Sequence, residues 1–142
     1  MSRYAIVAAT FYAELAEALT ASARDVFLAD GAEAVDVFTV PGAFELPLAA
    51  GYCAESGRYD GVACVGAVIR GETTHYDYVC GEAARGIMDV QLATKVPCGF
   101  GILTVESMEQ ARARAGGGKR DSGRHAAAAV LAVVGVRAQL GA

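Results

Sequence analysis

The sequence has no tryptophan, only two histidines and no excess of basic residues. Its 16 acidic side chains outnumber the 12 basic ones, which disfavours an electrostatic interface with nucleic acid. The most apolar stretch, 126–136, is shorter than the roughly 20 residues that a membrane-spanning helix needs. It also lies between Arg124 and Arg137. We therefore expect neither a nucleic-acid partner nor a membrane-spanning segment.

Metal-binding patterns are missing as well. The four cysteines show no CxxC spacing and have no histidine pair near them, so a zinc site is not expected. Cys64 and Cys98 fall within apolar runs, which favours small buried side chains. The first eleven residues lack the long apolar region and cleavage site of a signal peptide, and we interpret them as leading into a strand. These observations favour a cytoplasmic protein that binds no metal.

Apolar residues, in contrast, are abundant: they make up 54% of the 142 residues, enough for one compact domain spanning 1–142. Short apolar runs alternate with helical patterns, which is typical of parallel strands joined by crossover helices. We therefore expect a four-stranded parallel sheet in a three-layer α/β/α sandwich. The predicted strands are 4–9, 35–40, 62–69 and 98–105. The predicted helices are one that stops at Gly31, one over 43–56, one between 73 and 95, one from Ser107 to about Arg114, and one from about Ser122.

Ligands of parallel α/β sheets bind beyond the carboxyl ends of the strands. His75 lies there, after the most apolar strand and at a predicted helix start. A histidine transfers protons near neutral pH, so His75 is a candidate catalytic residue. The alternative is a histidine that only caps the helix or hydrogen-bonds locally. His125 lies among alanines of the last helix, which favours a structural or solvent-facing role.

Two other segments reach the same edge. In the turn 41–45, Gly42 and Ala43 let a ligand approach the backbone, and Phe44 and Glu45 could supply an apolar wall and an acceptor for hydroxyl groups. The alternative is a tight turn with a core phenylalanine and a glutamate that interacts with the helix dipole. Residues 71–74, Gly-Glu-Thr-Thr, begin a helix and could bind a phosphate through backbone N–H groups and hydroxyls. P-loop and dinucleotide patterns are absent, so a phosphorylated small molecule fits better than a nucleotide.

Some candidates remain open from the residues alone. Phe11 and Phe100 lie near predicted strands, where each is either a core ring or a surface that stacks on a planar ligand. Arg114 or the pair 119–120 could hold a phosphate, or could be solvated surface charges.

Taken in order, these motifs resemble lumazine synthases along nearly the whole chain. The resemblance rests on Phe11, PGAFE at 41–45, GAVIRGETTHYDYV at 66–79, GFGILTVE at 99–106 and EQARARAG at 109–116. The combination of PGAFE and GAVIRGETTHYDYV at this spacing is highly specific to the family. It implies a flavodoxin-like sandwich and the condensation of 5-amino-6-(D-ribitylamino)uracil with 3,4-dihydroxy-2-butanone 4-phosphate. The product, 6,7-dimethyl-8-ribityllumazine, is the immediate precursor of riboflavin, and the reaction requires no cofactor.

The resemblance also implies a role for each matching residue. His75 would transfer protons while an imine forms, phosphate leaves, the second ring closes and water is lost. The resemblance places Phe11 on the pyrimidine ring, Ala43, Phe44 and Glu45 on the ribityl chain, Ala67, Val68 and Ile69 on the uracil edge, and Glu72 and Thr73 on the phosphate. Phe100 and Arg114 would complete the pocket, and both would come from a neighbouring subunit.

Two departures from the family pattern stand out. Ser122 occupies a position where many members have a lysine before the glycine of the last helix, and Lys119 or Arg120 is the hypothetical substitute. The chain also begins almost at its first strand, whereas members that build 60-subunit shells often carry about a dozen more residues. A pentamer or an assembly of pentamers is expected. The alternative function is a paralogue that acts mainly as a flavin- or lumazine-binding or shell-forming protein.

Overall fold

The computed structural model describes residues 2–142 and contains one sheet of four parallel strands in the order β2-β1-β3-β4. The strands are β1 (Arg3–Ala9), β2 (Ala34–Val40), β3 (Gly61–Ile69) and β4 (Cys98–Val105). The helices are α1 (Ala13–Ala29), α2 (Leu46–Glu55), α3 (His75–Thr94), α4 (Met108–Ala113) and α5 (Ser122–Gln139), and a 3₁₀ turn, η1 (Ala43–Glu45), precedes α2. Every predicted strand and helix is present within a few residues of its expected position.

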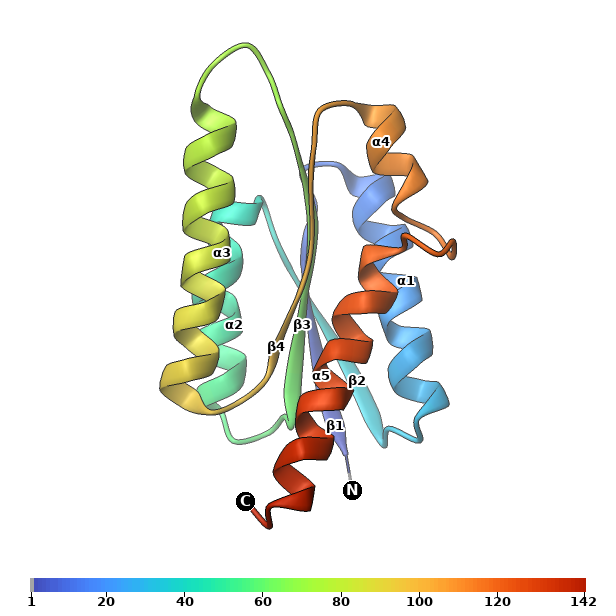
Figure 1. Ribbon diagram of the computed structural model, residues 1–142, viewed down its shortest axis with the longest axis vertical. Helices are drawn as coiled ribbons and strands as arrows, with labels where there is room; N and C mark the ends of the chain where they lie inside the picture. The colour runs from blue at the N-terminus through green and yellow to red at the C-terminus, as the bar shows by residue number, and fades with distance from the viewer. Residues whose placement is uncertain (1) are drawn as a thin grey trace.

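The helices cover both faces of the sheet, so the predicted three-layer sandwich is confirmed. Figure 1 shows α2 and α3 on one face and α1, α4 and α5 on the other. Alternate residues of each inner strand enter opposite cores, because successive side chains of a strand point to opposite faces. In β1, Ile6 packs beneath α1 and α5, whereas Val7 packs beneath α2 and α3. The result is a β3 strand buried on both faces through Ala67, as its continuous apolar run predicts.

The capping residues explain where the helices begin and end. Gly31, with φ +90°, follows the end of α1, and Lys95 ends α3 in the left-handed conformation with φ +62°. Asp121 caps α5 by accepting hydrogen bonds from two of its first backbone N–H groups. Helix α5 can lie close to the sheet because Gly99 has no Cβ: a methyl group there would collide with the backbone carbonyl of Ala126. Within residues 2–142, no helix is long and apolar enough to span a bilayer.

The predicted helix 43–56 is the one element that differs in kind. It begins as the 3₁₀ turn η1 and becomes α-helical only at Leu46. Pro47 lies in the first turn of α2, where its missing N–H leaves no hydrogen bond unmade. The short 3₁₀ turn keeps Phe44 and Glu45 at the carboxyl edge of the sheet, on the side where β1 and β3 also end.

Candidate functional site

A pocket of about 620 Å³ opens at the carboxyl ends of the strands. It lies where the strand order reverses between β1 and β3, the place at which parallel α/β sheets bind ligands. Its volume falls within the range of small-molecule sites. Nine of the twelve predicted site residues line it: Phe11, Ala43, Phe44, Glu45, Ala67, Val68, Ile69, Thr73 and His75.

Aromatic rings form much of the pocket wall. The side chains of Phe11, Phe44 and Tyr78 are 75%, 59% and 70% exposed, so none of them is a core residue. The interpretation of Phe11 and Phe44 as core rings is therefore wrong. Large apolar rings left exposed around a concave surface indicate a place where a planar or apolar ligand is bound.

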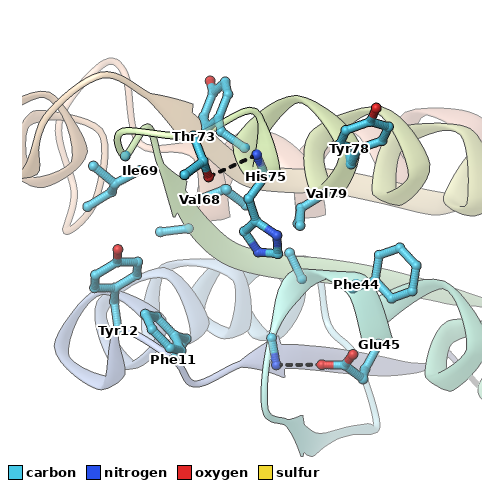
Figure 2. A pocket seen from close by; sticks show the side chains of 15 residues that line it. Phe11, Tyr12, Phe44, Glu45, Val68, Ile69, Thr73, His75, Tyr78 and Val79 are labelled. Atoms are coloured by element: carbon cyan, nitrogen blue, oxygen red, sulfur yellow. Dashed lines mark hydrogen bonds between the residues drawn. The ribbon is translucent and has the colours of Figure 1, made fainter.

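His75 is the first residue of α3, directly after the N-cap residue Thr74. Its backbone N–H donates to Thr73 Oγ1 over 3.3 Å, and Figure 2 shows its imidazole pointing into the pocket between Phe11 and Phe44. His75 is exposed, and its ring lines the pocket on the side of α3. A histidine in this position can exchange protons with a bound molecule.

Glu45 combines a structural contact with an available acceptor. Its Oε1 accepts the backbone N–H of Gly42 over 2.9 Å, which fixes the turn after β2 (Figure 2). Among the described residues, no group donates to its Oε2. The carboxylate is exposed at the pocket wall and can accept a hydrogen bond from a ligand hydroxyl.

The end of β3 offers backbone groups to the pocket. Strand β1 pairs with β3 only as far as Ala8 and Val65, whereas β4 follows β3 to Ile69. Residues 67–69 therefore run past the end of β1 and have no strand on that side. Backbone N–H and C=O groups on a free strand side can pair with the polar edge of a planar ligand.

Three predicted residues do not line this pocket. Glu72 lies in the exposed loop before α3, although its neighbours Gly71 and Thr73 line the wall. Phe100 lies on the edge strand β4 and is 43% exposed, so its alternative interpretation as a core ring is also wrong. Arg114 ends α4, where its guanidinium donates to the carbonyl of Gln110 over 3.0 Å.

Several residues line the pocket in addition to those that the sequence predicts. Tyr12, Tyr76, Tyr78 and Val79 line the wall beside residues that were identified, and their places next to Phe11 and His75 were the available signal. Burial, with added effects of Cys80, raises the pKa of the Tyr76 phenol above its ordinary value.

The cysteines are free and take no part in the pocket wall. Burial raises the pKa of Cys98 to about 12 and that of Cys64 well above its ordinary value. Both thiols are thus small buried side chains, as their positions in apolar runs predict. No group of three or more His, Cys, Asp or Glu side chains within residues 2–142 is arranged to hold a metal ion.

Comparison with known proteins identifies the family. The family model described as 6,7-dimethyl-8-ribityllumazine synthase matches residues 1–138. The 6,7-dimethyl-8-ribityllumazine synthase of Nitratidesulfovibrio vulgaris is 45% identical over 140 residues, an alignment that covers 97% of this chain and 90% of the relative. Proteins of the same name from Methylorubrum populi and Methylorubrum extorquens are 46% and 47% identical over 141 residues, covering 96% of this chain and 83% and 81% of theirs. The chain therefore belongs to the 6,7-dimethyl-8-ribityllumazine synthase family.

Proposed function

We propose that this protein condenses 5-amino-6-(D-ribitylamino)uracil with 3,4-dihydroxy-2-butanone 4-phosphate to give 6,7-dimethyl-8-ribityllumazine, releasing phosphate and water. The observation that carries the proposal is the pocket itself, in which a histidine, exposed aromatic rings and a free strand side converge. Membership of the family and relatives of this name over nearly the whole chain support the same activity. A protein that only binds lumazine or flavin would have no use for a proton-transferring side chain in this wall.

Each part of the pocket suits one part of the substrates. The exposed Phe11 ring can stack on the pyrimidine, and the free side of residues 67–69 can pair with its polar edge. Ala43 leaves room for the ribityl chain beside Phe44, and Glu45 Oε2 can accept a hydrogen bond from its hydroxyls. The pocket thus orients the amine of the first substrate toward the start of α3.

The phosphate substrate fits at the start of α3. Backbone N–H groups and the positive end of the helix dipole favour an anion there, and Thr73 adds a hydroxyl group. In this arrangement His75 would transfer protons at nitrogen and oxygen while the imine forms, and would take a proton from carbon when phosphate is eliminated. Holding two reactants together supplies much of the acceleration, because an intramolecular geometry replaces a bimolecular encounter.

An absorbance assay of lumazine formation tests this proposal. Wild-type protein should form product from the two substrates, and His75→Ala should retain only part of the rate because positioning survives the loss of proton transfer. His125→Ala is the matched control, since that histidine lies in α5, is exposed and does not line the pocket. A folded wild type without product contradicts the function, and equal rates for His75→Ala and wild type remove His75 from its role.

We further propose that the active assembly is a pentamer, or is built of pentamers, and that Phe100 and Arg114 act in the pocket of a neighbouring subunit. Both residues lie outside the pocket of their own chain, and Phe100 is exposed on the edge strand. An arginine from a neighbour would supply the phosphate with the cation that this wall lacks among its lining residues. The family's usual lysine position is Ser122 here, which makes that arginine more important.

Mixed assemblies test the shared pocket. His75→Ala and Arg114→Ala proteins should each be impaired alone. When the two are unfolded and reassembled together in equal amounts, about one quarter of the pockets should contain neither substitution. Activity above that of either variant supports the proposal, and no gain after light scattering has verified co-assembly contradicts it.

The free thiols also support a cytoplasmic location, because disulfides are rare in that reducing compartment.

A further inference from the structure

The loop that carries Thr73 and His75 is held mainly at its two ends. Residues 71–75 are all exposed, and the hydrogen bond from His75 N–H to Thr73 Oγ1 lies within the loop itself. Apart from its two chain neighbours, Gly71 has no atom within 4 Å of where a Cβ would lie. An exposed loop with so little packing adopts one conformation only if its flanking residues are fixed.

Arg70 fixes the end of β3 from which this loop departs. Its backbone N–H donates to the carbonyl of Val105 over 2.9 Å, which continues the pairing of β3 with β4. Its guanidinium Nε lies 2.9 Å from Glu106 Oε2, and its Nη2 lies 3.3 Å from Asp77 Oδ1. One side chain therefore joins the end of β3, the first turn of α3 and the residue that follows β4.

The same guanidinium also contacts the pocket wall from outside. Its Cζ lies 4.3 Å from the ring centroid of Tyr76, which lines the pocket, whereas Arg70 does not line it. Tyr76 and Asp77 directly follow His75, so Arg70 contacts two successive residues in the turn that presents the imidazole. Burial alone would lower the pKa of Arg70, but the neighbouring carboxylates of Glu106 and Asp77 raise it, as expected for a guanidinium paired with two carboxylates.

We propose that Arg70 is a positioning residue: by joining the end of β3 to Asp77 and Glu106, it fixes the loop that presents Thr73 and His75 to the pocket. The proposal rests on the proposed function for its kinetic readout. Exposed ion pairs contribute little to overall stability, so the contact matters for local geometry and not for holding the fold together. Residues 67–69 are held by their own backbone pairing with β4, and the turn 43–45 by the hydrogen bond from Gly42 N–H to Glu45, and neither contact involves the Arg70 side chain.

The dependence on one loop predicts a specific kinetic signature. Because a misplacement of about 1 Å can cost on the order of 100-fold in rate, Arg70→Ala should lower kcat by roughly 10-fold. The KM for the phosphate substrate should rise several-fold, since Thr73 and the start of α3 would bind that substrate. The KM for the uracil substrate should stay within about 2-fold of wild type, since β3 and η1 are unchanged.

Arg58→Ala is a closely matched control. Arg58 makes the same two kinds of contact, an ion pair with Asp36 at 3.8 Å and a position 5.4 Å from the Tyr59 ring centroid. It lies between α2 and β3, at the amino end of the sheet, and away from the pocket wall. Its removal should leave kcat and both KM values unchanged. A kinetic defect in Arg70→Ala no larger than that in Arg58→Ala overturns the proposal.

The two carboxylate partners separate positioning from direct contact with substrate. Asp77→Asn and Glu106→Gln should each reproduce part of the Arg70→Ala defect, and adding either to Arg70→Ala should change little, because coupled residues are not additive. Arg70→Lys should recover part of the rate, since one ammonium group can pair with one carboxylate. If both carboxylate variants match wild type while Arg70→Ala is impaired, Arg70 acts on the substrate directly and the proposal is wrong.

A readout without substrate separates this proposal from the proposed function. The chain has two histidines, so imidazole NMR signals can be assigned with His75→Ala. Arg70→Ala should shift or broaden the His75 signals and leave those of His125 unchanged, whereas Arg58→Ala should change neither. Unchanged His75 signals overturn the positioning role. A wild type that forms no product instead contradicts the function, and this spectroscopic test still applies.

Discussion

Asp121 should be among the most important polar residues for stability. It is the one buried polar or charged residue in the part of the chain that the structure describes, with 0% exposure. Its two carboxylate oxygens accept three backbone N–H groups, from Gly117 at 2.6 Å, Gly123 at 3.0 Å and Arg124 at 3.3 Å. These contacts both begin α5 and close the loop 116–121.

Two opposing effects decide how far Asp121→Ala lowers the free energy of unfolding. Removing a buried charge saves its desolvation cost, but the backbone donors stay in place and lose their acceptor. An N-cap substitution costs about 1 kcal/mol, and a buried donor left without a partner adds about 1–3 kcal/mol. Gly123 is itself buried, so water cannot replace the carboxylate there. We therefore expect Asp121→Ala to lower the free energy of unfolding by about 3 kcal/mol.

Thermal unfolding at one fixed protein concentration measures this effect, because association also shifts Tm. An unfolding entropy of about 2.1 cal/mol/K per residue gives about 0.3 kcal/mol/K for this chain, so Tm should fall by about 10 °C. Asp121→Asn keeps one acceptor oxygen and should fall about half as far. Ser107→Ala removes an exposed cap with a single 3.2 Å bond and should fall by no more than about 3 °C. A Tm for Asp121→Ala no lower than that of Ser107→Ala would refute the reasoning.

Three further predictions concern other parts of the molecule. Ser122→Lys should lower the KM for the phosphate substrate about 3- to 10-fold in steady-state assays, because it adds a cation at the position where the resemblance to the family implies a phosphate-side lysine. Gly99→Ala should lower Tm by more than Asp121→Ala, since its methyl group meets the backbone of Ala126, which can move only with α5. Burial and the 2.6 Å hydrogen bond to Asp36 raise the pKa of Tyr59. The neutral phenol therefore stabilises the fold fully below about pH 10, the ordinary pKa of tyrosine, and this stabilisation is lost as pH rises through the folded-state pKa. Urea unfolding should therefore show that Tyr59→Phe is less stable than wild type at pH 8 and that the difference shrinks by pH 11.

The regular elements could be predicted from the sequence because their causes are local. Continuous apolar runs mark β3 and β4, and Gly31 and Ser107 mark a helix end and a helix start through backbone conformation and capping. At the start of α4, Ser107 Oγ accepts the N–H of Gln110, while the side chain of Gln110 accepts the N–H of Glu106. The exposure of Phe11 and Phe44 was harder to predict. Most phenylalanine side chains are buried, so a sequence alone favours a core position for each of them. The exposure of these two rings depends on where their turns lie in the folded chain.

The contacts of Arg70 show why the remaining features required a structure. Its partners lie 7 and 36 positions further along the chain, and no periodic pattern relates an arginine after one strand to a glutamate after another. Only the pairing of β3 with β4 brings those two strand ends together, and only the start of α3 above them adds Asp77. The motif 66–79 therefore contains both residues that line the pocket and residues that hold one another in place. Within it, His75 and Thr73 face the pocket, whereas Arg70 and Asp77 form the ion pair that fixes how they face it.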